Sequence, residues 1–558
     1  MKIDRRRFLA SLSGAAAAPA LRLGASAQAL PQAVSPSRLA SDPRRPQYHL
    51  LPPANWMNDP NAPIYWNGNY HMFYQYNPDG AYWGDMHWGH AVSPDMVHWR
   101  HLPVALSPTP GGPDAQGCFT GTAAVDDGRV AILYTGVCAA PLREATSKDS
   151  AHPLRESQCL VVAADPDLKT WIKTAAPVIA APPPGLAVNG FRDPSPWRQG
   201  DWWYLVAASG IANQGGAVLL YRSKYLPGNL SENLHSWEYM HILSGRGRAG
   251  AGSSDPSDRF DPFDPWEVWE CPEFFALGDW HVLIFSTAGK TYWQSGRLDA
   301  ETMIFHPAQS GLADYGSFYA AKTQLDKDGN RILWGWIQEA RPLAEYKAAG
   351  WAGLMSLPRV LTVADDGRLR FSVSPAVKQL RRREQKLSVT HDDESNRRQI
   401  AAMQVENCCG EILCRLRASS GPFRLILSGS DKDAAVWLML EWDHEDAANR
   451  NSSPDNSTLN NSSAGNSTPV GHLSIDGHPL PPLDSLNSGE DSDFELRIYV
   501  DGSVLEIFIR DQLAWTKRFY PAGSAAQNLR LQWTGRTTTI EQLSVWQLAP
   551  ISPDRLTA

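Results

Sequence analysis

Short apolar segments recur along the amino-terminal part of this chain, and most are followed by a second such segment, a turn and a large aromatic residue. The first segments of the five copies are 70–76, 130–134, 202–206, 281–285 and 331–336. Alternating β-branched and aromatic residues bounded by Asp, Gly and Pro favour antiparallel hairpins over helices. Five copies spaced by roughly 50 to 80 residues therefore predict an all-β fold whose first domain is a five-bladed β-propeller.

Three acidic motifs occupy the same place in different copies of this repeat. Their acids are Asp59, Asp193 and Glu270, and each lies about ten residues before the first segment of its copy. In a propeller the first strand of every blade lines the central channel, so residues far apart in sequence meet there. The same offset places Phe119, Thr120, Phe318 and Tyr319 on the first strands of the second and fifth copies. We therefore expect one site built around three carboxylates.

The chain has 558 residues, which is too long for one compact core, and its character changes near residue 375. We expect the propeller over 45–374 and a basic, polar linker over 375–390. Short alternating strands follow and predict a β-sandwich over 391–550. Within it, an Asn- and Ser-rich tract at 449–468 has no apolar periodicity and is expected to be a disordered loop.

The formal net charge of −8 and the lack of a basic stripe argue against nucleic acid as a partner, and a neutral substrate fits better. Residues 1–29 combine Arg5, Arg6 and Arg7 with a mild apolar stretch and small residues ending at Ala27. This is typical of an export signal and resembles the twin-arginine type. After it, no apolar run is long enough to span a bilayer. We expect the mature protein to work in the periplasm or outside the cell.

Two carboxylates that face each other across a pocket can cleave a glycosidic bond, one as nucleophile or base and the other as proton donor. Glu270 has apolar neighbours in sequence, and an apolar setting favours the protonated acid. Asp59 lies between asparagines, which suit an ionised nucleophile. Asp193 follows Arg192, whose charge is expected to keep it ionised beside a sugar ring. The residues expected to bind the sugar by stacking and hydrogen bonds are Asn58, Gln75, Trp83, Phe119, Thr120 and Arg192.

Two pairs of histidines, at 87 and 90 and at 98 and 101, look like paired metal ligands. On a strand such a spacing points the two side chains to opposite faces, and no third ligand is in evidence. We therefore expect no metal and no other cofactor. The seven cysteines form no dense disulfide framework in a chain of this size. The sequence leaves open whether Cys408, Cys409 and Cys414 include one disulfide.

At these residues the sequence resembles glycoside hydrolase family 32, which contains the invertases, inulinases, levanases and related fructosyltransferases. The resemblance runs from about 48 to 547 and includes the motifs at 56–61, 75–78, 88–93, 119–121, 192–194, 270–272 and 501–508. It implies a five-bladed propeller with a carboxy-terminal β-sandwich and a retaining mechanism on β-fructofuranosides. Carried over by motif, Asp59 is the nucleophile, Glu270 the acid/base, and Asp193 the transition-state stabiliser that binds fructose hydroxyls. We expect an exported, metal-independent hydrolase of sucrose or of fructans such as levan and inulin.

The sequence departs from the family pattern at two places near these motifs. Ala62 stands where the first motif usually ends in Gly, and the stretch 246–265 suggests a longer loop at the rim of the site. Three other activities stay open at this point. They are fructosyl transfer, fructan binding without catalysis, and the inverting chemistry of five-bladed arabinan and xylan hydrolases.

Overall fold

The structure is a computed structural model that describes residues 34–147, 153–226, 236–246, 267–417, 421–429, 435–444, 471–483, 494–521 and 528–552. The chain divides into two compact units, one centred on Tyr48–Gln379 and the other on Leu380–Ala549. The export signal expected over 1–29 and the tract at 449–468 lie outside the described residues, as does nearly all of the loop at 246–265. The expectations for those segments stay predictions.

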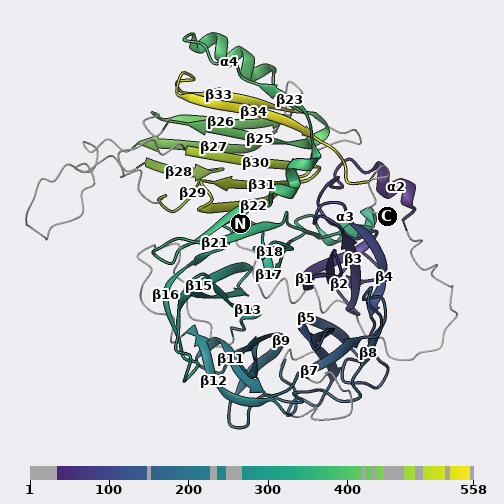
Figure 1. Cartoon of the computed structure of the whole chain (residues 1–558). Helices are drawn as coiled ribbons and strands as arrows, with labels where there is room; N and C mark the ends of the chain where they lie inside the picture. Colours follow the sequence, from purple (N-terminus) through teal and green to yellow (C-terminus); the bar gives the residue numbers. More distant parts are fainter. Residues whose placement is uncertain are drawn as a thin grey trace, which may run out of the picture. The chain divides into compact units, whose positions relative to one another are not determined.

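The first unit is built from five sheets that follow one another along the chain (Figure 1). The first contains β1 (Asn55–Trp66), β2 (Asn69–Asn77), β3 (His87–Ser93) and β4 (Arg100–Leu106), with β19 (Trp351–Ala352) beside β1. The second contains β5 (Gly117–Asp126), β6 (Arg129–Ala139), β7 (Leu154–Ala163) and β8 (Trp171–Lys173). The third contains β9 (Val188–Gln199), β10 (Trp202–Ile211), β11 (Gly215–Ser223) and β12 (Glu238–Gly245). The fourth contains β13 (Glu270–Leu277), β14 (Trp280–Thr287), β15 (Lys290–Leu298) and β16 (Phe305–Leu312). The fifth contains β17 (Tyr319–Leu325), β18 (Arg331–Ile337), β21 (Arg359–Val363) and β22 (Leu369–Val373), with β20 (Leu354–Met355) against β18.

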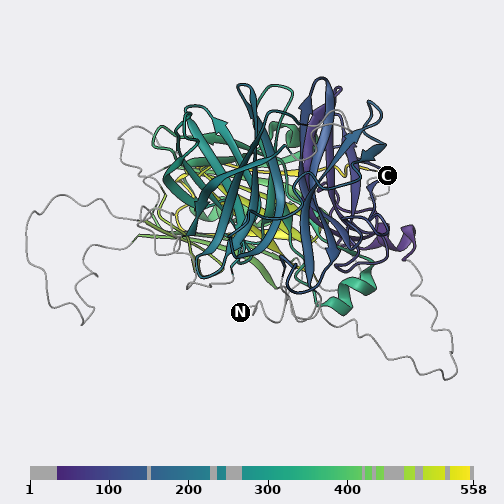
Figure 2. The same ribbon diagram turned by 90° about the horizontal axis from the view of Figure 1, so that it is seen from below.

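The first strands of the five sheets form a closed ring. β1 contacts β5, β5 contacts β9, β9 contacts β13, β13 contacts β17, and β17 returns to β1. Figure 1 shows the sheets around this centre, and Figure 2 shows their strands lengthwise. Apolar side chains fill the spaces between neighbouring sheets, as between the second and third, where Leu133, Leu160 and Leu205 are fully buried. The ring therefore has packed walls and leaves its centre to polar side chains.

A late segment of the chain completes the first sheet. β19 runs parallel to β1, with Trp351 opposite Asn55 and Ala352 opposite Trp56. Gly353 follows with φ at 77°, and a Cβ there would lie 1.8 Å from the Met57 carbonyl oxygen. Only glycine fits so close an approach in this backbone conformation.

Each of the five inner strands has a register irregularity at a similar place. The partner register shifts between Met57 and Pro60, Cys118 and Gly121, Arg192 and Ser195, Glu270 and Glu273, and Tyr319 and Lys322. A bulge inserts an extra residue and turns side chains away from the regular alternation. Asp193, Cys271 and Ala320 within these segments adopt positive φ values of 60°, 51° and 54°. The bulges therefore aim side chains from five separate segments toward one end of the ring.

The second unit contains two six-stranded sheets. One has the order β23 (Arg381–Lys386), β34 (Ile540–Leu548), β25 (Cys409–Leu416), β30 (Phe494–Asp501), β31 (Val504–Ile509), β32 (Leu513–Arg518). The other has the order β24 (Gln404–Val405), β33 (Leu529–Thr534), β26 (Phe423–Gly429), β27 (Val436–His444), β28 (Gly471–Ile475), β29 (His478–Pro479). Burial alternates strictly along β33, so one of its faces is covered and the other is exposed.

The structure differs from the linker expected over 375–390. Residues Pro375–Leu380 form a 3-10 helix, and β23 is an edge strand of the first of these sheets. Basic residues made this stretch resemble solvated chain, but Arg381 forms two hydrogen bonds to the buried Glu411 carboxylate, at 2.7 and 2.6 Å. Charged residues are common on edge strands because they discourage pairing with another chain.

Short helices connect the strands. In the first unit they are α2 (Pro36–Ser41) and α3 (Leu343–Ala349), and in the second α4 (Asp393–Ala402) and a 3-10 turn at Glu406–Cys408. α4 was not expected from the sequence; Asp392 caps it by accepting a hydrogen bond from the Glu394 amide. Among the described residues, no helix has the length and apolar character needed to cross a membrane. All seven cysteines are free thiols, so the disulfide left open among Cys408, Cys409 and Cys414 is not formed in this structure.

Candidate active site

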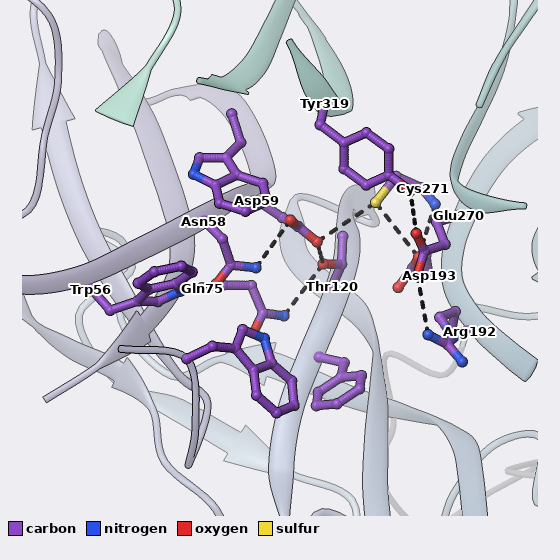
Figure 3. Close-up of a pocket in the computed structure, with 13 residues that line it drawn as sticks. Trp56, Asn58, Asp59, Gln75, Thr120, Arg192, Asp193, Glu270, Cys271 and Tyr319 are labelled. Atoms are coloured by element: carbon purple, nitrogen blue, oxygen red, sulfur yellow. Dashed lines mark hydrogen bonds and ion pairs between the residues drawn. The ribbon is translucent and has the colours of Figure 1, made fainter. Parts of the chain in front are cut away.

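One pocket in the first unit brings together the three acids and the six residues expected to bind the sugar (Figure 3). Its lining consists of Trp56, Asn58, Asp59, Gln75, Trp83, Phe119, Thr120, Arg192, Asp193, Glu270, Cys271, Tyr319 and Trp336. Tyr319 follows from the repeat offset, whereas Trp336 comes from β18, a second strand for which the offset predicts nothing. Phe318, which the offset placed beside Tyr319, is instead buried among the apolar side chains between the fourth and fifth sheets. Most of the polar lining belongs to the bulged segments of the inner strands, which explains why the side chains converge.

A chain of hydrogen bonds fixes the Asp59 carboxylate. Asn58 Nδ2 donates to Oδ1 of Asp59 at 3.0 Å, and Thr120 Oγ1 donates to Oδ2 at 2.6 Å. Asn58 accepts in turn from Trp56 Nε1 at 2.7 Å, and Thr120 accepts from Gln75 Nε2 at 3.3 Å. Burial raises the pKa of Asp59, and the hydrogen bonds from Thr120 and Asn58 oppose that rise. The neutral donors hold both carboxylate oxygens in fixed positions, as a nucleophile requires.

Asp193 is almost fully buried, and its backbone is left-handed with φ at 60°. The Cys271 amide donates to Oδ2 of Asp193 at 2.8 Å, and the Asp193 amide donates to Thr135 Oγ1 at 2.7 Å. Burial raises the pKa of Asp193 to about 7, although the Arg192 charge lowers it; the negative charges of Asp59 and Glu270 raise it further. Arg192 therefore favours the ionised form of Asp193, as expected, but its charge does not outweigh the effect of burial.

Arg192 forms its ion pairs with two other carboxylates. Its Nη2 lies 2.8 Å from Glu156 Oε1, and its Nη1 lies 3.2 Å from Glu270 Oε1. Burial lowers the pKa of Arg192, but the charges of Glu156 and Glu270 raise it by more. The guanidinium is thus a permanent cation, and its ion pairs are with Glu156 and Glu270 rather than with Asp193.

Glu270 lies between Arg192 and Tyr319, whose hydroxyl donates to Oε2 of Glu270 (Figure 3). The apolar setting expected from its sequence neighbours is not found. Trp269 instead stacks on Phe285 in the core, with ring centroids 3.8 Å apart. Successive residues of an extended segment point to opposite sides, so sequence neighbours of Glu270 do not surround its carboxylate.

Glu273, the next carboxylate along β13, lies outside the pocket lining and is buried. Its Oε1 accepts from Lys322 Nζ at 3.0 Å, Thr122 Oγ1 at 3.1 Å and Ser195 Oγ at 3.1 Å. These partners come from three other inner strands. Because Glu273 is committed to this buried ion pair, it is not available as an alternative proton donor.

Ala62, which stands where the family motif usually has Gly, does not line the pocket. Ala62 is fully buried, has φ at 42° and packs among the apolar side chains between the first and second sheets. Its backbone conformation is one that glycine adopts more readily, which matches the family preference at this position. The change therefore alters the wall behind the site and leaves the pocket lining unchanged.

The histidine pairs contribute no metal site. His90 is buried and its Nε2 lies 2.9 Å from His71 Nδ1, while His98 contacts the Asp95 carboxylate at 2.8 Å. Within the described ranges, no group of three or more His, Cys, Asp or Glu residues is arranged to hold a metal ion.

The raised pKa of Asp193 predicts an effect on stability. A carboxyl whose pKa is higher in the folded than in the unfolded state favours folding less as pH rises, here between about 4 and about 7. At pH 8, Asp193→Asn is expected to raise the free energy of unfolding by up to about 4 kcal/mol, and near pH 4 by almost nothing. Denaturant unfolding of both proteins across this range measures the difference.

Asp114→Asn is the matched control for this prediction. The pKa of Asp114 is lowered, because hydrogen bonds from Lys173 and Tyr134 outweigh the effect of burial. The folded state therefore gains stability from this carboxylate above its unfolded pKa, and Asp114→Asn is expected to destabilise the protein at pH 8. A stability gain in Asp193→Asn that is equal at pH 4 and pH 8 would contradict the titration of Asp193.

Comparison with known proteins follows the same division of the chain. A family model described as the N-terminal domain of glycosyl hydrolases family 32 matches residues 49–373, and one described as the C terminal of that family matches 376–547. The chain belongs to glycosyl hydrolase family 32. The expectation of a glycosidase is thereby confirmed.

Proteins similar to this chain include two from Escherichia coli. Sucrose-6-phosphate hydrolase is 31% identical over 90% of this chain and 94% of its own length. Raffinose invertase is 36% identical over 62% of this chain and 67% of its own length. Among solved structures, a family 32 β-fructofuranosidase of Bombyx mori is 25% identical and aligns with a TM-score of 0.66, covering 92% of this chain and 97% of the other.

Proposed function

We propose that the protein is a retaining hydrolase of β-fructofuranosyl bonds in sucrose, in fructans such as levan and inulin, or in both. The observation that carries this proposal is a single pocket with three carboxylates in three different settings. Neutral side-chain donors hold Asp59, a backbone amide holds Asp193, and a cation and a phenol hold Glu270. We further propose that the five sheets are the blades of a β-propeller and that the second unit is a β-sandwich.

In the first step, Glu270 gives a proton to the glycosidic oxygen while an Asp59 oxygen attacks the anomeric carbon of the fructosyl group. The bond to the leaving sugar breaks, and a fructosyl ester forms on Asp59. In the second step, Glu270 takes a proton from water, which attacks the same carbon and releases Asp59. Each attack inverts the anomeric carbon, so the product keeps the original configuration.

Asp193 is proposed to accept hydrogen bonds from fructose hydroxyls. Its Oδ2 receives the Cys271 amide, and the role of ligand acceptor is proposed for the second oxygen, Oδ1. An anion at this point stabilises the positive charge that develops on the sugar ring in the transition state. A carboxyl with a pKa of about 7 is partly protonated in the free protein, and binding a hydroxyl donor favours its ionised form.

The pocket favours a neutral sugar over a sugar phosphate. Among the residues that the structure describes, Arg192 is the one cation in the pocket lining, and both of its ion pairs are already made within the protein. At the rim, Trp83 is 39% exposed and meets Phe119 edge to face at 6.0 Å. Exposed aromatic faces suit the apolar faces of uncharged sugar rings.

Product analysis over sucrose, sucrose 6-phosphate, raffinose, inulin and levan tests this function. Release of fructose from sucrose or a fructan, with little preference for the phosphorylated sugar, is the expected result. Accumulation of oligofructosides at high sucrose would identify a transferase instead. Activity on an arabinofuranoside with none on any fructoside would overturn the proposal, as would binding without turnover.

We expect full activity in EDTA. The proposed charges in the reaction are handled by carboxylates, a guanidinium and hydroxyl groups, so no step calls for a metal ion. Initial rates of sucrose cleavage before and after dialysis against EDTA provide the measurement. Loss of activity that one particular divalent ion restores would contradict this prediction.

A further inference from the structure

Side chains of the second sheet hold the backbone of Phe191–Asp193 on the third sheet. β9 is the inner edge strand of its sheet, so some of its backbone groups have no neighbouring strand. The Phe191 amide donates to Glu156 Oε2 at 2.7 Å, and the Phe191 carbonyl accepts from Gln158 Nε2 at 2.9 Å. The Asp193 amide donates to Thr135 Oγ1 at 2.7 Å. Three side chains on β6 and β7 thus replace the missing strand.

Glu156 differs from Thr135 and Gln158 because it is charged. Its side chain is 1% exposed, and Oε2 also accepts from Thr146 Oγ1 at 2.8 Å. Its other oxygen forms the 2.8 Å ion pair with Arg192. A buried carboxylate is tolerated only when such partners compensate for lost hydration. Glu156 therefore fixes the backbone of the site and a guanidinium in it at the same time.

Arg192 connects Glu156 to Glu270 through two ion pairs. Its guanidinium lies between the Glu156 carboxylate on β7 and the Glu270 carboxylate on β13. The other titratable groups whose charge acts on Arg192 or Glu270 are Asp193, Tyr319, Asp59 and Cys271. Two carboxylates that flank one cation also repel each other, so the negative form of each is favoured less than it would be beside the cation alone.

We propose that Glu156 is a positioning residue with two effects. It holds Arg192 in place, and its negative charge offsets part of the effect of the Arg192 charge on Glu270, so that Glu270 can hold a proton to deliver. This inference rests on the acid/base role of Glu270 in the proposed function. It assigns a reaction-specific task to a residue that lies outside the pocket lining.

Glu156→Gln tests the inference, because it keeps an oxygen for the Phe191 amide and removes both the charge and the acceptor that face Arg192 Nη2. Without the Glu156 charge, its repulsion of the Glu270 carboxylate is lost while the attraction of Arg192 for Glu270 stays, which favours the carboxylate form. We expect kcat on sucrose to fall about tenfold, with a smaller change in KM. The high-pH limb of the kcat profile is expected to move down by roughly one pH unit. The loss of kcat on an aryl fructoside should be smaller, since the aryl leaving group departs with little protonation.

Gln158→Met is the matched control, since it removes the contacts with the Phe191 carbonyl and the Thr135 hydroxyl but no charge. It is expected to lower the melting temperature while the pH profile stays in place. A Glu156→Gln protein with an unchanged pH limb and equal losses on both substrates would overturn the inference, since this is what a structural role alone produces.

If Glu156→Gln does not fold, Glu156→Asp replaces it. The shorter side chain keeps the charge but withdraws it from Arg192, and kcat on sucrose is expected to fall at least about threefold. Wild-type kcat in that variant would overturn the inference. If the wild-type protein cleaves no fructoside, the proposed function itself is wrong. If the wild-type protein is active and the Glu156 variants are as active as the wild type, only this inference is wrong.

Discussion

Asp59→Asn is expected to lower kcat on sucrose by more than about 100-fold, a loss of at least about 3 kcal/mol of transition-state stabilisation. An amide does not form the covalent fructosyl intermediate, whereas its oxygen still accepts the hydrogen bond from Asn58. The fold and the affinity for sugar are therefore expected to stay close to those of the wild type. Steady-state kinetics, calorimetric binding of sucrose and thermal unfolding measure the three properties separately.

Thr120→Val is the matched control for this variant. It removes the 2.6 Å hydrogen bond to Asp59 but leaves the carboxylate in place. We expect a loss of roughly tenfold, between the wild type and Asp59→Asn. If Asp59→Asn retains more than about a hundredth of the wild-type kcat, Asp59 is not the nucleophile.

Glu270→Ala is expected to lose sucrose cleavage almost completely and to keep much of the first step on an aryl fructoside. The reason is that a good leaving group departs with little protonation, while the glucose of sucrose does not. Azide is then expected to speed product release, because it attacks the fructosyl enzyme without needing a base. Burst kinetics and identification of a fructosyl azide with retained configuration are the measurements.

Glu273→Gln separates this effect from general damage to β13. Glu273 is buried with Lys322, so its loss is expected to lower stability and to give no response to azide. Equal losses of Glu270→Ala on both substrates, with no azide effect, would move the acid/base role to another residue.

The position of the three acids was predictable because their motifs recur at one offset in a repeat. Residues at equivalent places on inner strands converge whatever their sequence separation, as Asp59 and Glu270 do. The offset also reaches Tyr319, which forms part of the pocket lining. It does not reach Trp336, since that residue belongs to a second strand.

The electrostatic environment was not predictable in the same way. Sequence placed Arg192 beside Asp193, yet the Arg192 ion pairs are with Glu156 and Glu270. Arg192 and Asp193 both line the same pocket, yet the carboxylates that pair with Arg192 come from other segments of the chain. Glu156 carries no motif and lies in the polar first half of β7, where a lone acid gives no signal of its partner.

The boundary between the units shows a related limit. Residues 381–386 are rich in charge, and composition alone marks them as solvated chain. Their place in a sheet follows from Glu411, which lies elsewhere in the sequence and accepts the hydrogen bonds of Arg381. Long-range partners of charged residues leave no periodicity that a local pattern can detect.

The parallel pairing of β19 with β1 has a consequence for how the protein is made. β1, which carries Asp59, leaves the ribosome before the other strands of the first unit, yet its neighbour Trp351 is among the last residues of that unit to be synthesised. Until then β1 keeps an unpaired edge, and the contact that covers it must close across nearly the whole unit, which is entropically slow. The nascent chain thus acquires a finished reaction centre only after β17 and β18, which carry Tyr319 and Trp336, have emerged, and incomplete chains expose an edge of β1 that can pair with a wrong partner.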